Sequence, residues 1–254
     1  MIFKWYGTAS VSVQSGDSSV LFDPFVPLRF SHAPTKPADY DGFTDIVITH
    51  AHIDHIASLP ELFARAPRQI YGTRATVDAL TGLGIPRDSL HLIKPGDCLV
   101  FGGIRVTAFA GRHVKFDSKT VLRTAFSPRM LRCIGNLPGI LRSVLACKEK
   151  GETVAYLIEA EGKRIFLLGS LSYIPEQEYP TDVDALILPY QGTSDLLTPA
   201  RELIGLTKPK HVILDHFDDT FPPISADIDT SDIADFCSET LKLTVPDHLS
   251  PMTL

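Results

Sequence analysis

The sequence predicts an α/β (α+β) protein folded as a four-layer αββα sandwich, in which two sheets pack face to face and helices cover the outside. The first 50 residues contain short segments rich in Val, Ile and aromatic residues, separated by Gly, Ser and Asp, as expected of strands joined by turns. Segments with helical spacing then alternate with strands, and the same order recurs in the second half. Such a succession is typical of sheets that bury one face against each other and the other face under helices.

The first half opens with strands and continues with helices. The strands expected before residue 50 are IFKWYG, SVSVQS, SVLFDPF and TDIVIT, the last being a continuous apolar run of the kind buried on both faces. A Pro-rich loop over 24–37 separates the third strand from the fourth. Helical spacing follows in IASLPELFARA and TRATVDALTGLG, with the strand QIYGT between them.

The second half repeats this order. Two hairpins are expected, one turning at Gly102-Gly103 and one at Glu161-Gly162. Alternating segments come next: the strand DALILPYQG, the helix TPARELIGLT, the strand HVILDHF and a closing helix over DIADFCSETLKL. The whole chain, 1–254, is expected to form a single domain.

Bulk composition narrows the functional classes. A net charge of −6 argues against a nucleic-acid partner, and no apolar run reaches the roughly 20 residues that a membrane-spanning helix needs. The N-terminus lacks the pattern of a secretion signal. Four cysteines without a CxxC pair are typical of reduced thiols, so we expect a cytoplasmic protein. The sequence is also compatible with a homo-oligomer.

The segment 115–150 departs from the rhythm of strands and helices. It carries eight Lys or Arg against two acidic residues, a net charge of +6, which leaves −12 for the rest of the chain. Its apolar residues recur at helical spacing, and Pro138 is expected to start a second helix; they are Met130, Ile134, Leu137, Leu141 and Val144. Two interpretations stay open: a helical hairpin that packs this stripe on the core, or a basic lid over an active site.

A dense histidine cluster lies in the stretch THAHIDHIASLP, residues 49–60. On a strand, His50 and His52 would face the same way and present two imidazoles to one ion. Asp54 and His55 would fall in the following helical turn and point to a neighbouring position. Imidazole suits zinc and related divalent ions such as manganese or iron, so the cluster predicts a metal site with one or two ions.

The stretch THAHIDH resembles the signature motif of the metallo-β-lactamase superfamily. Three flanking segments match as well: LFDPF with Asp23, AGRHVKF with His113 and VILDHFDD with His216. The order of elements is similar to the ascorbate-6-phosphate lactonase-like branch. The resemblance implies a metallo-β-lactamase-type fold with a helical insertion, in which Asp23 holds the metal-bearing loop.

The resemblance also implies the ligand sets. His50, His52 and His113 would hold the first ion, and Asp54, His55 and His216 the second, with Asp54 also catalytic. The family's bridging aspartate is replaced here by Ser170, whose neutral hydroxyl is a much weaker ligand. Two ions bridged only by water, one ion, or a degenerate site remain open, and Asp182 or Asp184 could substitute as the carboxylate.

The function predicted from these residues is a metal-dependent hydrolase. It would use a metal-bound hydroxide to cleave an ester, lactone or phosphodiester bond in a small anionic substrate. Arg112 and Lys115 flank His113 and would hold the anion, and His32 in the Pro-rich loop could reach it. Asp215 and Asp218 flank His216 and would orient its imidazole.

Two other functions are kept. The first is a catalytically weakened metal-binding fold that acts as a sensor or binding partner, which the serine at position 170 favours. The second is a nuclease, which the acidic net charge disfavours.

Overall fold

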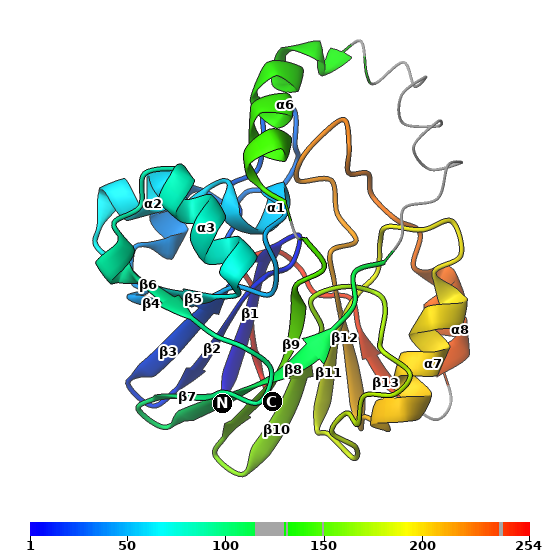
Figure 1. Ribbon diagram of the computed structural model, residues 1–254. Coiled ribbons are helices and arrows are strands. Elements are labelled where there is room, and N and C mark those ends of the chain that lie inside the picture. Colours follow the sequence, from blue (N-terminus) through cyan, green and yellow to red (C-terminus); the bar gives the residue numbers. More distant parts are fainter. Residues whose placement is uncertain (115–129, 131, 149, 239–240) are drawn as a thin grey trace.

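Two mixed sheets of seven strands pack face to face, with helices on the outer faces (Figure 1). The computed structural model describes residues 1–114, 130, 132–148, 150–238 and 241–254. The strand order is β14-β1-β2-β3-β4-β5-β6 in the first sheet and β13-β12-β11-β10-β9-β8-β7 in the second. The predicted αββα sandwich is confirmed.

The first sheet is formed by the N-terminal part of the chain and one C-terminal strand. Its strands are β1 (Ile2–Gly7), β2 (Ser10–Ser15), β3 (Ser18–Phe22), β4 (Asp45–Val47), β5 (Gln69–Gly72), β6 (Leu90–Leu92) and β14 (Pro251–Thr253). The helical segments between them are η1 (Pro37–Tyr40), α1 (Ile53–Ile56), α2 (Leu59–Arg65), α3 (Arg74–Gly82) and η2 (Arg87–Ser89). From β14 to β3 neighbouring strands are antiparallel, and from β3 to β6 they are parallel.

The second sheet follows the same plan. Its strands are β7 (Cys98–Phe101), β8 (Ile104–Gly111), β9 (Thr153–Ala160), β10 (Lys163–Leu167), β11 (Ala185–Pro189), β12 (His211–Asp215) and β13 (Lys242–Thr244). The helical segments are η3 (Ile134–Asn136), α6 (Leu137–Ala146), α7 (Leu197–Thr207) and α8 (Ser231–Cys237). Strands from β7 to β10 pair antiparallel, and those from β10 to β13 pair parallel.

Both predicted hairpins turn at the expected residues. Their tight turns need backbone in the left-handed region, which glycine adopts easily. Glu161 (φ 52) and Gly162 (φ 72) both have positive φ between β9 and β10, which matches the twist of the two strands. Gly102 (φ 56) does the same between β7 and β8.

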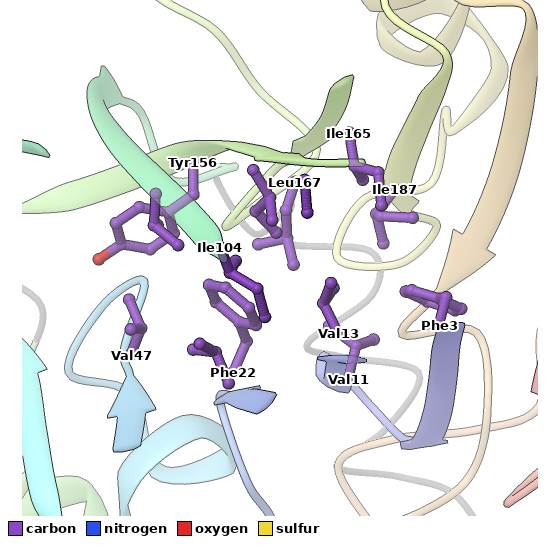
Figure 2. Close-up of a cluster of buried hydrophobic side chains, with 14 of the residues drawn as sticks. Phe3, Val11, Val13, Phe22, Val47, Ile104, Tyr156, Ile165, Leu167 and Ile187 are labelled. Atoms are coloured by element: carbon purple, nitrogen blue, oxygen red, sulfur yellow. The ribbon is translucent and has the colours of Figure 1, made fainter. Parts of the chain in front are cut away.

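The main core lies between the two sheets (Figure 2). Side chains at every second position of the first sheet meet their counterparts from the second, as the alternation of a strand requires. Those labelled in Figure 2 are Phe3, Val11, Val13, Phe22, Val47, Ile104, Tyr156, Ile165, Leu167 and Ile187. Two further clusters fill the spaces between each sheet and its helices, so that the segment Ala185–Pro189 is buried throughout.

The functional residues gather at one edge of the sandwich because of the strand directions. The parallel strands β3 and β4 end at the same edge of the first sheet. In the second sheet β8 and β10 both pair antiparallel with β9, so they run in the same direction as each other and as β12. The loops that follow these strands therefore lie close together, and they contain the predicted site.

The structure corrects several predicted boundaries. The expected closing helix ends at Cys237, and Lys242–Thr244 instead form strand β13, which pairs with β12. Residues 239–240 between them lie outside the described part of the chain. The helix expected over 56–66 is the shorter α2, Leu59–Arg65, because Ile56 instead ends α1, and the edge strands β6 and β14 were not predicted.

Part of the 115–150 segment is described. Residues 115–129, 131 and 149 lie outside the described residues, so the lid remains a prediction. In α6, Pro138 lies in the first turn and Ile140 packs against Phe25 and Phe221. Leu141 and Val144 point to solvent, so the expected apolar stripe does not pack wholly on the core. Within the described ranges, no helix combines the length and apolar character that crossing a bilayer requires.

A pH-dependent contribution to stability is expected where β12 meets β13. Nε2 of His211 lies 2.8 Å from Oγ1 of Thr244, and burial lowers the pKa of His211 to about 4. The unfolded chain, with a histidine pKa of about 6.5, binds more protons than the folded chain between these values. This contribution is therefore present above pH ~6.5 and is lost as the pH falls toward 4.

We expect His211→Gln to weaken the fall in melting temperature between pH 7 and pH 4.5, as measured by thermal denaturation. His91→Gln, in the first sheet, is the control and should leave that fall unchanged. Parallel pH profiles for His211→Gln and the unmodified protein would contradict the prediction.

Candidate metal centre

The histidine cluster lies in the loop between β4 and α1, and not on a strand as predicted. Strand β4 ends at Val47: the Ile48 N–H still donates to the Tyr71 carbonyl oxygen of β5 at 2.8 Å, but the Thr49 N–H donates to Oδ1 of Asp23 at 2.8 Å. His52 is the residue that precedes the first turn of α1, and Asp54 and His55 lie within it, as expected. The loop still directs His50 and His52 toward one point.

Three imidazoles meet at the first position. Nε2 of His50 lies 3.1 Å from Nδ1 of His52, which lies 3.1 Å from Nε2 of His113. His113 comes from the end of β8 in the other sheet. These three nitrogens lie within 4.8 Å of one another, a spacing that allows them to bind one ion.

The second position is formed by a carboxylate and two imidazoles. Oδ2 of Asp54 lies 2.8 Å from Nε2 of His216 and 3.6 Å from Nε2 of His55. His216 follows the last residue of β12. The ring centroids of His50 and His55 are 3.9 Å apart, so the two positions are immediate neighbours.

Hydrogen bonds to Nδ1 orient three of the rings, those of His50, His55 and His113. The Thr49 hydroxyl donates to Oδ2 of Asp23 at 2.6 Å, so it accepts from Nδ1 of His50 at 3.0 Å. Nδ1 of His55 donates to Oδ2 of Asp23 at 3.0 Å, and Nδ1 of His113 donates to the carbonyl oxygen of the next residue at 2.6 Å. Nε2 of His50, His55 and His113 therefore faces the two positions, as metal ligation requires, and His52 faces the first position with its Nδ1. This donor set fits divalent zinc, with manganese or iron as other candidates.

The two positions differ electrostatically. Burial lowers the pKa of His50 well below its usual range and that of His113 to about 4, so both rings are neutral at pH 7, the form that binds metals. Burial also opposes the charged form of His216, but its hydrogen bond to Asp54 outweighs this and raises its pKa to about 9. Burial favours the neutral form of Asp54, yet the imidazoles of His55 and His216 hold its pKa far below its usual range, so it is a carboxylate.

Three residues in the loops around the site have left-handed backbone, and hydrogen bonds hold them in it. Thr8 (φ 46), Asp23 (φ 44) and His216 (φ 57) all have positive φ, which is uncommon outside glycine and costs about 1 kcal/mol or more each. The His216 N–H donates to the carbonyl oxygen of Thr8 at 2.8 Å, and Nε1 of Trp5 donates to the same oxygen at 2.7 Å. These contacts offset the cost and determine where His216 lies.

Asp218 does not contact the His216 ring as predicted, but supports its backbone. Its Oδ1 accepts from the Thr8 N–H at 2.9 Å, and its Oδ2 lies 2.8 Å from Nε2 of His248. The His248 ring stacks on Trp5, with ring centroids 4.3 Å apart. Sequence reasoning missed Thr8, Trp5 and His248, because they lie near the two ends of the chain and far from the motif.

Asp215 is fully buried, and neither of its oxygens has a hydrogen-bond partner among the residues described. Burial raises its pKa to about 8. The predicted contact with the His216 ring is therefore not formed, and Nδ1 of His216 is also buried without a partner in the described structure.

Ser170 supports the loop that carries His113. Its hydroxyl accepts from the Val114 N–H at 3.0 Å. At the preceding Gly169, an added Cβ would lie 2.7 Å from Cβ of Thr49 and 2.6 Å from a backbone oxygen, so only glycine fits there. The 169–170 segment thus passes between the loop of Thr49 and that of His113.

The other predicted site residues lie apart from the two trios. Arg112 is exposed beside His113, and Lys115 lies outside the described residues. Asp184 binds Lys210 at 2.8 Å and the backbone of Arg164, which is a structural role, and Asp182 is exposed. His32 is exposed and belongs to neither trio.

The fold and the site agree with a comparison to known families. A profile described as the beta-lactamase superfamily domain matches residues 18–217. Because this match covers most of the chain, the protein belongs to that superfamily, and the predicted superfamily is confirmed.

Individual proteins support this assignment. The chain is 25% identical over 229 residues to a UPF0173 metal-dependent hydrolase of Polynucleobacter asymbioticus, covering 84% of this chain and 73% of that one. It is 25% identical over 231 residues to another from Alkaliphilus metalliredigens, covering 89% of each. Among solved structures, Igni18, a metallo hydrolase of Ignicoccus hospitalis, superposes with a TM-score of 0.66 at 19% identity, covering 99% of this chain and 97% of the other.

These names agree with the enzyme class predicted from the sequence. The ascorbate-6-phosphate lactonase-like branch is not confirmed by them and remains a prediction.

We expect Asp23→Asn to lower metal affinity by about 10- to 100-fold, because an amide cannot accept from both Thr49 and His55 with the same two oxygens. Asparagine tolerates left-handed backbone, so the fold should persist. Elemental analysis after dialysis against graded chelator measures the effect. Asp45→Asn on β4 is the matched control, and equal metal retention in the two variants would argue against the role of Asp23.

We expect Ser170→Ala to weaken binding at the His50–His52–His113 position by about tenfold, since the Val114 N–H loses its acceptor. Ser170→Asp should instead raise occupancy of the second position by restoring a carboxylate. Ions per chain, titrated by calorimetry, separate the two effects, with Ser172→Ala as the control. An unchanged stoichiometry and affinity in both variants would remove this account of position 170.

Proposed function

We propose that the protein is a metal-dependent hydrolase that cleaves an ester, lactone or phosphodiester bond in a small anionic substrate. The observation that carries this proposal is the adjacency of two donor trios. His50, His52 and His113 converge on one point, and Asp54, His55 and His216 converge on the next. Two neighbouring divalent ions suit hydrolysis better than a purely structural role, because structural sites usually close a single ion with four ligands.

A divalent ion held by the two trios would supply the reactive water. When bound, a divalent ion lowers the pKa of a coordinated water toward neutrality and polarises a carbonyl or phosphoryl oxygen. One or two ions per chain are compatible with the donors, and zinc fits the mixture of imidazole and carboxylate best.

The protein's own groups orient the reactants. The Asp54 carboxylate is ionised and lies at the second position, where it can accept a hydrogen bond from the attacking water. Because its pKa lies far below neutrality, Asp54 orients this water and does not retain its proton. His50 and His55 are held by Asp23, directly or through Thr49, so their rings do not turn during the reaction.

An anionic substrate is supported by the charges beside His113. Arg112 is exposed and directly precedes it, and Lys115 follows two residues later in the sequence. A guanidinium there can pair with a phosphate or carboxylate through two parallel hydrogen bonds. Four unpaired cysteines support the cytoplasm as the compartment.

A second function is favoured by one observation. In the sequence Ser170 stands where the resemblance expects a bridging carboxylate, and its hydroxyl accepts from the Val114 N–H. A site weakened in this way would bind metal without turnover and serve as a sensor or binding partner.

The test is hydrolysis of p-nitrophenyl esters, bis-p-nitrophenyl phosphate and simple lactones by metal-stripped protein, before and after adding zinc or manganese. We expect metal to restore activity, and His52→Ala to lower kcat/KM by about 100-fold or more together with the metal content. His91→Ala is the matched control. Full metal binding without turnover of any compound in the panel would favour the sensor, and unchanged activity in His52→Ala would refute the ligand assignment.

A further inference from the structure

Four large apolar side chains are exposed on α6 and on the two segments that pack against it. Helix α6 lies at the end of the molecule opposite the chain termini (Figure 1). Leu141 is 63% exposed, Val144 43%, Ile224 40% and Phe30 37%. We call these four residues the α6 rim. Exposed apolar side chains that gather in one place are unusual on a soluble surface and mark a site of interaction.

The three segments that carry the rim are packed together. The side-chain amide of Asn136, just before α6, donates to the carbonyl oxygens of Arg29 at 2.9 Å and Pro222 at 2.8 Å. Beneath the helix, Ile140 packs with Phe25 and Phe221 from the other two segments. The rim is therefore a built surface and not three independent loops.

The exposed charges named beside the rim are mostly positive. The Arg29 guanidinium lies 4.9 Å from the ring centroid of Phe30, and that of Arg132 lies 6.0 Å from it. Lys148 is exposed two residues after the end of α6. In the third segment Asp218 and Asp219 are buried and hydrogen-bonded within the protein, whereas Asp227, three residues after Ile224, is exposed and accepts from the Asp219 N–H at 3.2 Å. Three exposed cations, Arg29, Arg132 and Lys148, thus stand against the exposed carboxylate of Asp227, on a chain whose net charge is −6.

We propose that the α6 rim docks the protein on the surface of an anionic lipid bilayer. Leu141, Val144 and Phe30 would enter the boundary between headgroups and acyl chains, while the neighbouring cations pair with lipid phosphates. An exposed apolar helix face flanked by basic residues has the composition of a membrane-surface element. The acidic remainder of the chain is repelled by such a surface, so contact is restricted to this end.

A protein partner fits the rim less well. Four partly exposed side chains offer on the order of a few hundred Å², below the ~800 Å² that each partner contributes to a standard interface. A lipid surface needs no matching shape, and the paired signal of apolar side chains and cations is sufficient for reversible binding.

Docking at this end would set the metal centre beside the membrane. Ile53 of α1 packs in the same cluster as Ile140, and Asp54 and His55 follow it directly. The inference does not depend on hydrolysis, since lipid binding can be measured without any substrate.

The experiment is flotation of the full chain with 100-nm vesicles of phosphatidylcholine alone, or of phosphatidylcholine with phosphatidylglycerol. We expect binding to the anionic vesicles only, weakening as salt rises. Leu141→Gln with Val144→Gln should raise the lipid concentration needed for half-binding by about tenfold. Val100→Gln is the matched control, because Val100 is also 63% exposed but lies on β7, away from α6 (Figure 1).

Circular dichroism and metal content of the double variant verify that it folds, and Arg29→Gln with Arg132→Gln tests the electrostatic part separately. Absence of binding to anionic vesicles would overturn the proposal, as would binding by the double variant equal to that of Val100→Gln. A self-association of the unmodified protein that the double variant abolishes, seen by sedimentation velocity in the absence of lipid binding, would assign the rim to a second copy of the chain instead.

Discussion

The metal centre depends on one buried carboxylate, that of Asp23. Its two oxygens accept from the backbone N–H and hydroxyl of Thr49 and from Nδ1 of His55. The Thr49 hydroxyl in turn accepts from Nδ1 of His50 and so orients that ring. One residue at the end of β3 thereby orients a donor in each trio. Hydrogen bonds to an ionised group contribute about 1.5–3 kcal/mol each, and all of these are shielded from water. The left-handed backbone of Asp23 is compatible with this role, because it lets the carboxylate face the loop after β4.

Both sheets contribute to the site, so its precision depends on the packing between them. The first sheet supplies His50, His52, Asp54 and His55 from one loop, and the second supplies His113 and His216. The core drawn in Figure 2 holds the sheets at a fixed separation, and a close-packed interior resists small displacements. The two trios nevertheless differ in character. The imidazoles of His50 and His113 at the first position are neutral, while Asp54 and His216 at the second position are charged.

Much of this arrangement is local in sequence. The histidine stretch, its position between a strand and a helix, and the histidines that end β8 and β12 can be read from short segments, because metal ligation needs particular residue types at loop ends. Supporting contacts are not local. Thr8, Trp5 and His248 act on His216 from more than 200 residues earlier or from the far end of the chain, and nothing in their own neighbourhoods indicates this. The position of Ser170, under the backbone of Val114, likewise requires the folded chain.

The sequence by itself determined the sandwich, its hairpin turns and the six donor residues, since strand alternation, positive-φ turns and ligand chemistry all act over a few residues. Only the tertiary structure decided how the closing segment folds, because the pairing of Lys242–Thr244 with β12 overrides the helical spacing of their own segment. It also decided that Leu141 and Val144 face solvent while Ile140 faces the core. Helical periodicity defines an apolar stripe on α6, but which part of it is covered depends on loops distant in sequence.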